Sequence, residues 1–226
     1  MTARRQAASH NRGAAGEIDL AADRKRALAL VPVSRETAAR LDRFVALLLQ
    51  WQAKTNLIAS ATVGEIWTRH IADSLQLAAL APQAKVWVDL GTGAGFPGLV
   101  IACALAEQAD AVVHLVESNQ KKAAFLREAV RLTGAPAKVH AGRIEEFVTS
   151  DRIDVVTARA LAPLKNVLAL AESLLKTGAV GLFLKGQDVE AELTEASKYW
   201  TIAATLVPSK TSPTGRVVVI RKAERR

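Results

Sequence analysis

The feature that most constrains the fold of this chain is a glycine-rich run at residues 89–98, with the sequence DLGTGAGFPG. A short apolar, β-rich segment at 85–90 leads into it, and an apolar helical pattern at 99–106 follows it. The glycines therefore turn the chain from a strand into a helix. In open α/β sheets, ligands bind beside such a turn, at the carboxyl ends of the strands. The run predicts a ligand site after the first strand of an α/β sheet.

The rest of the chain alternates short β-rich runs with helical ones. We expect strands at 85–90, 112–117, 137–140, 153–157 and 179–184, helices at 99–106, 120–132, 163–178 and after Asp188, and a closing hairpin of strands at 202–207 and 216–221. Such alternation builds a mainly parallel sheet with helices on both faces. The predicted fold class is therefore α/β and Rossmann-like, with a mainly parallel seven-stranded sheet and a C-terminal antiparallel hairpin.

Composition shifts divide the chain into three parts. Residues 1–32 show no sustained apolar period and predict a flexible basic extension, 33–82 predict an N-terminal helical cap, and 83–226 form the ligand-binding domain. The net charge of +8 lies mostly at the two ends, with six basic and three acidic residues in 1–32 and four against one in 221–226. These ends can attract RNA phosphates, or they can be solvated tails that only aid solubility.

Composition also limits the compartment and the kinds of site. No segment reaches the roughly 18–20 apolar residues that cross a bilayer, and no apolar run makes the basic start a secretory signal. An arginine-rich start also fits an organelle transit peptide, but the first 17 residues offer no large apolar face. The single cysteine, Cys103, excludes intramolecular disulfides and multi-cysteine metal sites. We expect a cytoplasmic, monomeric protein with no membrane partner and no bound metal.

Two carboxylates indicate the class of ligand. Asp89 ends the first strand two residues before Gly91, where it is unfavourable beside a pyrophosphate but suits the ammonium and sulfonium groups of S-adenosylmethionine. Glu117 ends the second strand and can accept hydrogen bonds from ribose hydroxyls, which NAD and S-adenosylmethionine share. A glycine turn without a ligand and a surface Glu117 that caps the next helix are the plainer interpretations. The combination favours S-adenosylmethionine.

Several motifs, taken in order, resemble one protein family. They are RHIADS at 69–74, the glycine run at 89–98, ESNQKKAAFL at 117–126, GRIEEF at 142–147, TARA at 157–160 and LKGQ at 184–187. Together they resemble the ribosomal RNA small subunit methyltransferase G family over roughly residues 34–221. Many members carry Asp where this chain has Glu117. The resemblance implies a class I methyltransferase that uses S-adenosyl-L-methionine to methylate N7 of a specific guanosine near the decoding centre of 16S ribosomal RNA. The implied partner is 16S ribosomal RNA or a small ribosomal subunit precursor.

The same resemblance implies the site residues. The implied cofactor-binding residues are Asp89, Gly91, Gly93, Gly95, Phe96, Glu117, Ile144, Glu145 and Arg159. Guanine N7 has a lone pair and no proton, so we expect no general base, and Arg159, Lys185 and His70 are candidates for positioning the substrate. The plainer interpretations are an ion pair at a strand end for Arg159, a solvated side chain for Lys185 and a structural hydrogen-bond network for His70.

Other function classes stay open at the level of the sequence. Another RNA or a small molecule can be the methyl acceptor, and an NAD-dependent dehydrogenase shares the glycines and Glu117. The dehydrogenase is opposed by Asp89 and by the lack of an evident proton donor at the strand ends. A non-catalytic RNA-binding protein is disfavoured by the complete cofactor loop. The cofactor that raises the melting temperature would distinguish these classes.

Overall fold

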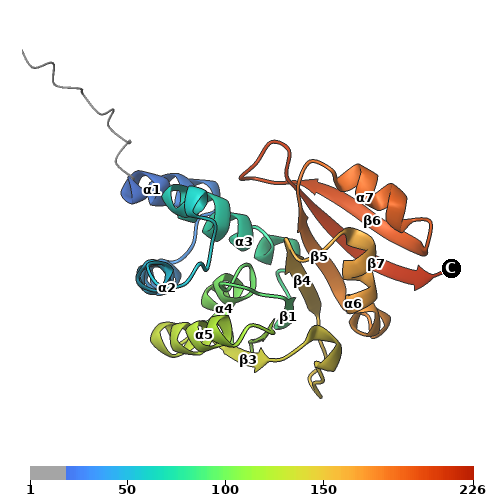
Figure 1. Cartoon of the computed structure of the whole chain (residues 1–226), viewed down its shortest axis with the longest axis horizontal. Coiled ribbons are helices and arrows are strands. Elements are labelled where there is room, and N and C mark those ends of the chain that lie inside the picture. The colour runs from blue at the N-terminus through green and yellow to red at the C-terminus, as the bar shows by residue number, and fades with distance from the viewer. Residues whose placement is uncertain (1–18) are drawn as a thin grey trace, which may run out of the picture.

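The computed structural model describes residues 19–226. They form an α/β fold with a central seven-stranded sheet (Figure 1). The strands are β1 (Val86–Leu90), β2 (Val112–Glu117), β3 (Ala137–Ala141), β4 (Val155–Arg159), β5 (Val180–Lys185), β6 (Trp200–Pro208) and β7 (Arg216–Arg225). Their order is β3-β2-β1-β4-β5-β7-β6. Strands β1 to β5 pair in parallel, and β7 pairs antiparallel with both β5 and β6. The predicted fold class is confirmed.

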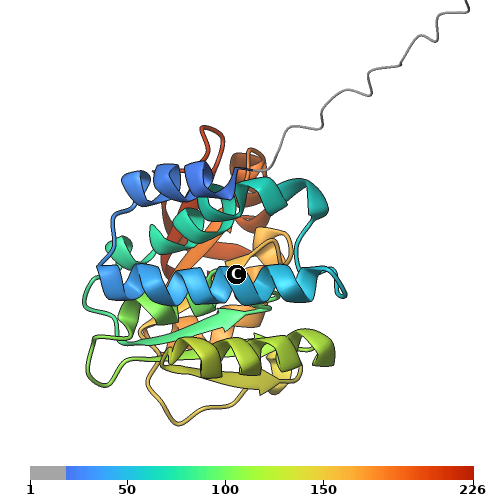
Figure 2. The ribbon, with the colours of Figure 1, turned by 90° about the vertical axis from the view of Figure 1, so that its left-hand side faces the viewer.

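Helices pack on both faces of the sheet. They are α1 (Leu20–Leu30), α2 (Arg35–Gln52), α3 (Asp73–Leu75), α4 (Gly98–Leu105), α5 (Gln120–Thr133), α6 (Leu164–Lys176) and α7 (Val189–Ala196). A π-helix at Trp67–Ala72 and 3₁₀ turns at Ser60–Glu65, Ala78–Leu80 and Ile144–Glu146 complete the secondary structure. Helices α4 and α5 cover one face with α2 packed against them, and α6 and α7 lie on the other (Figures 1 and 2). No helix of this described part is long and apolar enough to span a membrane.

Strand β1 shows why the sheet has two apolar cores. Trp87 belongs to the core under α2, α4 and α5, whereas its neighbours Val88 and Leu90 belong to the core under α6. Successive side chains of a strand point to opposite faces, and both faces of a parallel sheet are buried. The strand is therefore apolar at every position except Asp89. That buried carboxylate must find partners inside the protein.

Helix α1 corrects the predicted extent of the flexible extension. Residues 1–18 lie outside the described residues, but Leu20–Leu30 form a helix where we expected flexible chain as far as residue 32. Periodicity missed this helix because few apolar residues recur along it at helical spacing; its buried residues are Asp23 and Ala27. Its contacts are mainly with the π-helix, so α1 packs with the helical cap.

Polar contacts hold α1 in place. Asp23 is fully buried and accepts hydrogen bonds from the backbone N–H groups of Trp67 at 2.8 Å and Thr68 at 3.3 Å. On the outer side, Arg24 donates two hydrogen bonds to Asp42 of α2, at 2.7 and 2.8 Å. The Asp23 carboxylate therefore satisfies the first backbone donors of the π-helix, which would otherwise be unpaired.

Replacing Asp23 by alanine should lower the stability of the protein. The change leaves the buried N–H group of Trp67 and the partly buried one of Thr68 without an acceptor, which costs about 1–3 kcal/mol. For a chain of this size, each kcal/mol corresponds to roughly 2–4 °C in melting temperature. Asp42→Ala is the matched control, because its ion pair with Arg24 is partly exposed and such pairs contribute about 0–1 kcal/mol. Equal melting temperatures for the two variants would contradict the role of Asp23.

Candidate active site

The loop after β1 leaves open space beside its backbone. Gly93 has a φ of +58°, a left-handed conformation that glycine adopts readily. A Cβ atom added there would meet nothing closer than the Gly91 carbonyl oxygen, at 3.9 Å. Gly98 is the opposite case, because a Cβ atom added there would lie 2.6 Å from the Cβ atom of Asp89. The loop thus keeps a face open for a ligand at Gly93, while Gly98 allows α4 to start against β1.

The buried side chain of Asp89 anchors this loop through hydrogen bonds. Its Oδ2 accepts a hydrogen bond from the Gly98 N–H at 2.8 Å, and its Oδ1 accepts one from the Thr157 hydroxyl at 2.9 Å. Burial raises the pKa of Asp89 to about 6, against the opposing effect of these donors and of the Arg159 charge. Asp89 does not line the cavity described below. In the structure Asp89 joins β1, β4 and the start of α4, and its predicted contact with the cofactor ammonium group stays a prediction.

Glu117 ties the same loop to the end of β2. Its Oε2 accepts a hydrogen bond from the Gly93 N–H at 2.8 Å, and its Oε1 accepts one from the Asn119 N–H at 2.7 Å. A carboxylate oxygen has two lone pairs, so each oxygen can accept a second hydrogen bond. The predicted contact with ribose hydroxyls is compatible with this arrangement and stays a prediction.

A cavity of about 260 Å³ opens beside the loop. It brings together Gly91, Gly93, Phe96, His70 and Arg159, all of which the sequence singled out. The remaining lining comes from Leu57, Ile58, Ala59, Thr62, Thr92, Ala94, Lys122 and Ala160. Of the predicted loop residues, Gly95 lies behind the cavity, where a Cβ atom would come within 3.2 Å of the Phe44 ring.

Two predicted residues lie apart from this cavity. Ile144 and Glu145 belong to the 3₁₀ turn after β3, and neither lines the cavity beside Gly93. Ile144 packs partly buried against the core under α6, and Glu145 is exposed. Their predicted contact with the adenine side of a cofactor stays a prediction.

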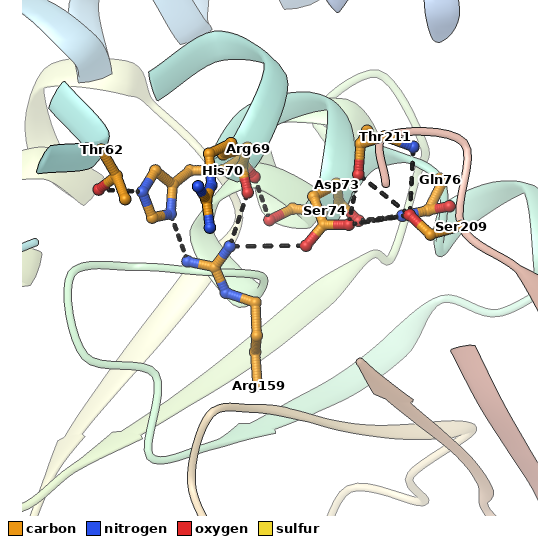
Figure 3. A network of polar contacts seen from close by, with 9 residues as sticks. All are labelled: Thr62, Arg69, His70, Asp73, Ser74, Gln76, Arg159, Ser209 and Thr211. Carbon is orange, nitrogen blue, oxygen red and sulfur yellow. Dashed lines mark hydrogen bonds and ion pairs between the residues drawn. The ribbon is translucent and has the colours of Figure 1, made fainter. Parts of the chain in front are cut away.

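Arg159, the last residue of β4, lies at the centre of a polar network (Figure 3). Its Nη1 donates to the Arg69 carbonyl oxygen at 3.0 Å and lies 3.6 Å from Asp73 Oδ2. Its Nη2 bonds to His70 Nδ1 at 2.6 Å, and the guanidinium stands 5.1 Å over the Phe96 ring. Burial lowers the pKa of Arg159, and the Asp73 and Asp89 carboxylates oppose this shift. The side chain is thus held in one position by the cap and the loop.

His70 is neutral in this network, and its tautomer follows from its partners. Because a guanidinium only donates, Nδ1 must be the acceptor from Arg159, and Nε2 then carries the proton that is donated to Thr62 Oγ1 at 2.9 Å. Burial, together with the charges of Arg159 and Arg69, lowers the pKa of His70 to about 3. His70 positions Arg159 in the structure.

The network contains residues that the sequence did not select. Asp73 Oδ1 accepts hydrogen bonds from Gln76 Nε2 and the Thr211 hydroxyl, both at 2.8 Å, and from the Ser209 hydroxyl at 3.4 Å. Asp73 follows His70 by three residues in the motif RHIADS, and this helical spacing predicts that both belong to one polar cluster. Gln76, Ser209 and Thr211 were not selected. The serine and threonine lie in the loop between β6 and β7, more than 130 residues along the chain, and no local pattern links them to Asp73.

Lys185 is engaged in an ion pair. Its Nζ donates to Glu192 Oε2 at 2.7 Å and to the Ala162 carbonyl oxygen at 2.6 Å, and its side chain is only 10% exposed. Glu192 also accepts a hydrogen bond from the Leu164 N–H. Lys185 therefore connects β5, α7 and the start of α6, and it also lines a cavity of about 550 Å³. Its predicted role in positioning the substrate stays a prediction.

With this geometry in view, comparison with known proteins identifies the family. Residues 37–216 match the family described as rRNA small subunit methyltransferase G. The chain belongs to this family. A relative named ribosomal RNA small subunit methyltransferase G, from Bradyrhizobium sp. (strain ORS 278), is 60% identical over 215 residues, covering 94% of this chain and 97% of the relative. A protein of the same name from Nitrobacter hamburgensis is 62% identical over 208 residues, covering 91% of this chain and 80% of the relative. Membership excludes the dehydrogenase alternative.

Solved structures share the fold of this methyltransferase G family member. An O-methyltransferase from Bacillus cereus in complex with SAH aligns with a TM-score of 0.57 at 14% identity, covering 89% of this chain and 97% of the other. A SAM-dependent methyltransferase from Aquifex aeolicus aligns with a TM-score of 0.52 at 15% identity, covering 66% and 89%. At such low identity the likeness concerns the fold alone.

Replacing Asp89 by asparagine should flatten the pH dependence of stability. Because burial raises its pKa from 3.8 to about 6, the folded protein binds this proton more tightly than the unfolded chain does. The resulting stabilisation is complete below about pH 4 and is lost as the pH rises through about 6. In urea unfolding, the free energy of the wild type should therefore fall relative to that of Asp89→Asn over this range.

Thr157→Val is the control for this measurement, because it removes a hydrogen-bond partner of Asp89 but keeps the titrating carboxyl group. It should retain the decline with pH. A free-energy difference between wild type and Asp89→Asn that stays constant from about pH 4 to 7 would contradict the role of Asp89.

Proposed function

We propose that this site transfers the methyl group of S-adenosylmethionine to N7 of a guanosine in 16S ribosomal RNA. The observation that carries the proposal is the family match over residues 37–216, which includes every residue of the polar network and the cofactor loop. The chain is a class I methyltransferase and an enzyme of ribosomal RNA modification. S-adenosylmethionine is its cofactor, and 16S ribosomal RNA is its substrate.

The residues around the cavity fit this cofactor. Gly93 presents open space beside its backbone, and the Glu117 oxygens keep lone pairs for ribose hydroxyls. Gly91 and Thr92 line the same cavity as Gly93, so the cofactor loop borders the space that the ligand would occupy. When bound, S-adenosylmethionine supplies an electrophilic methyl group. Gly91, Gly93 and Glu117 would hold it, with Ile144 and Glu145 on its adenine side.

The polar network suits an acceptor atom that carries no proton. Guanine N7 offers a lone pair, so transfer to it needs no general base and depends on position and electrostatics. His70 is neutral and already bonded to Arg159 and Thr62, which agrees with a positioning role. Arg159 would close the site between the cofactor and the incoming base.

The substrate form and the compartment are finer proposals. We propose that the enzyme acts on 16S ribosomal RNA in a small-subunit precursor, in the cytoplasm, where ribosomes assemble. We further propose that the enzyme acts as a monomer.

Replacing the target guanine by 7-deazaguanine should abolish methyl transfer. The analogue has a C–H group in place of N7 and therefore offers no lone pair at that position, while the other polar groups of the base are unchanged. Incorporation of labelled methyl groups and RNA binding should be measured in parallel, with binding expected to stay within about threefold, less than 1 kcal/mol. Methylation of the 7-deazaguanine substrate would show that another atom is the acceptor.

The rate of methyl transfer should be nearly flat between about pH 7 and 9. The pKa of His70 is lowered to about 3 and that of Asp89 is raised only to about 6, so neither group titrates in this window, and arginine stays charged throughout. Single-turnover rates at saturating cofactor and RNA give the test. His70→Asn, whose side-chain oxygen can still accept from Arg159, should be slower with the same flat profile. A wild-type inflection near pH 7 that disappears in this variant would make His70 a general base.

A further inference from the structure

Arg159 lines three adjoining cavities, not only the one beside the cofactor loop. It lines the cavity beside Gly93 and two neighbouring cavities of about 490 and 550 Å³, which lie toward the loop between β6 and β7. Asp73 lines both of the larger cavities as well. Because these spaces adjoin at Arg159, a base entering from the larger cavities would meet its guanidinium before it reached the cofactor loop.

The plane of this guanidinium is defined on several sides. The Arg69 carbonyl oxygen, His70 Nδ1 and the Phe96 ring each contact it, and its side chain is only 18% exposed. An arginine side chain fixed in this way presents its remaining N–H groups in set directions, which is a requirement for recognising a particular base edge.

Some of those N–H groups have no partner. A guanidinium has five N–H donors. Within the described part of the chain, Nη1 is used by Arg69 and Asp73 and one donor of Nη2 by His70, whereas Nε makes no hydrogen bond. The Nε–H group and the second Nη2 donor are therefore available to an acceptor on a substrate.

We propose that Arg159 reads the O6 atom of the target guanine, an inference that rests on the proposed function. O6 lies next to N7 on the same edge of guanine and accepts hydrogen bonds, whereas adenine has an amino donor at that position. A donor from Arg159 to O6 would orient N7 toward the methyl group and leave the N7 lone pair free. Adenine would place its amino donor against the guanidinium. Arg159 is thus a specificity-determining residue for guanine.

Asp73 offsets the positive charge that Arg159 brings close to the reacting base. Methylation at N7 gives the base a positive charge, which an isolated arginine beside O6 would oppose. Asp73 Oδ2 lies 3.6 Å from Arg159 Nη1, and both side chains are less than one fifth exposed. The pair therefore offers hydrogen-bond donors without a net positive charge.

A chemical and genetic cycle tests the inference. The methylated position is first mapped on 16S ribosomal RNA, and RNAs are then assembled by ligation with guanine or 2-aminopurine at that position. The analogue keeps N7 and the 2-amino group but lacks O6. With saturating S-adenosylmethionine, kcat/KM is measured for both RNAs with the wild type and with Arg159→Gln. The difference in intrinsic N7 reactivity between the bases is common to both enzymes and cancels.

The wild type should prefer guanine by a factor roughly 10- to 100-fold larger than the preference of Arg159→Gln, the scale of one charge-assisted hydrogen bond. Arg159→Lys cannot reproduce the contacts of a guanidinium and should also lose most of the preference for guanine. It replaces Arg159→Gln in the test if the glutamine variant does not fold. Arg152→Ala is the matched control, because Arg152 is an exposed arginine that precedes the first residue of β4, whereas Arg159 is the last. It should keep the wild-type ratio.

The outcomes separate this inference from the proposed function. If Arg159→Gln lowers kcat/KM equally for both RNAs, the side chain binds a phosphate or supports the fold, and the O6 contact is wrong. If the wild type methylates guanine and 2-aminopurine equally, the inference also fails while the proposed function stands. Failure of the wild type to methylate N7 of unmodified 16S ribosomal RNA, both free and in a small-subunit precursor, would overturn the proposed function itself.

Discussion

The position of the cofactor loop depends on the hydrogen bonds of the Asp89 carboxylate. This carboxylate is buried at the end of β1 and accepts hydrogen bonds from the start of α4, through the Gly98 N–H, and from Thr157 of β4. A buried carboxylate without such partners would be strongly destabilising. The need to satisfy it brings α4 so close to β1 that only glycine fits at position 98. These hydrogen bonds fix both ends of the intervening loop, and they thereby set its path and the open face at Gly93.

A second set of polar contacts joins the parts of the protein that only meet at the site. Arg159 at the end of β4 donates to the π-helix of the cap, and Asp73 of the cap accepts from the loop between β6 and β7. Burial makes each donor require an acceptor, which also selects the neutral tautomer of His70. The substrate side of the site therefore exists only when cap, sheet and hairpin are assembled together.

The predictability of the individual residues differs for physical reasons. The strands were predictable because a parallel sheet buried on both faces leaves runs of apolar residues. Helix α1 was missed because a buried carboxylate, Asp23, anchors it with little apolar periodicity. The ion pair of Lys185 with Glu192 was not predictable, because the turn between β5 and α7 decides whether the two side chains meet.

By itself, the sequence determined the fold class, the order of the strands and helices along the chain, the cofactor loop and the family. These features depend on local periodicity, on glycines at turns and on the order of the motifs, all of which are properties of neighbouring residues in the sequence. Only the tertiary structure decided what each polar side chain does. It joined Asp89 to Gly98 and Thr157, and it paired Lys185 with Glu192. It also placed Arg159 among His70, Arg69 and Asp73 with unused donors. Hydrogen bonds and ion pairs act over a few ångströms between residues on different elements, so their partners are known only once the chain has folded.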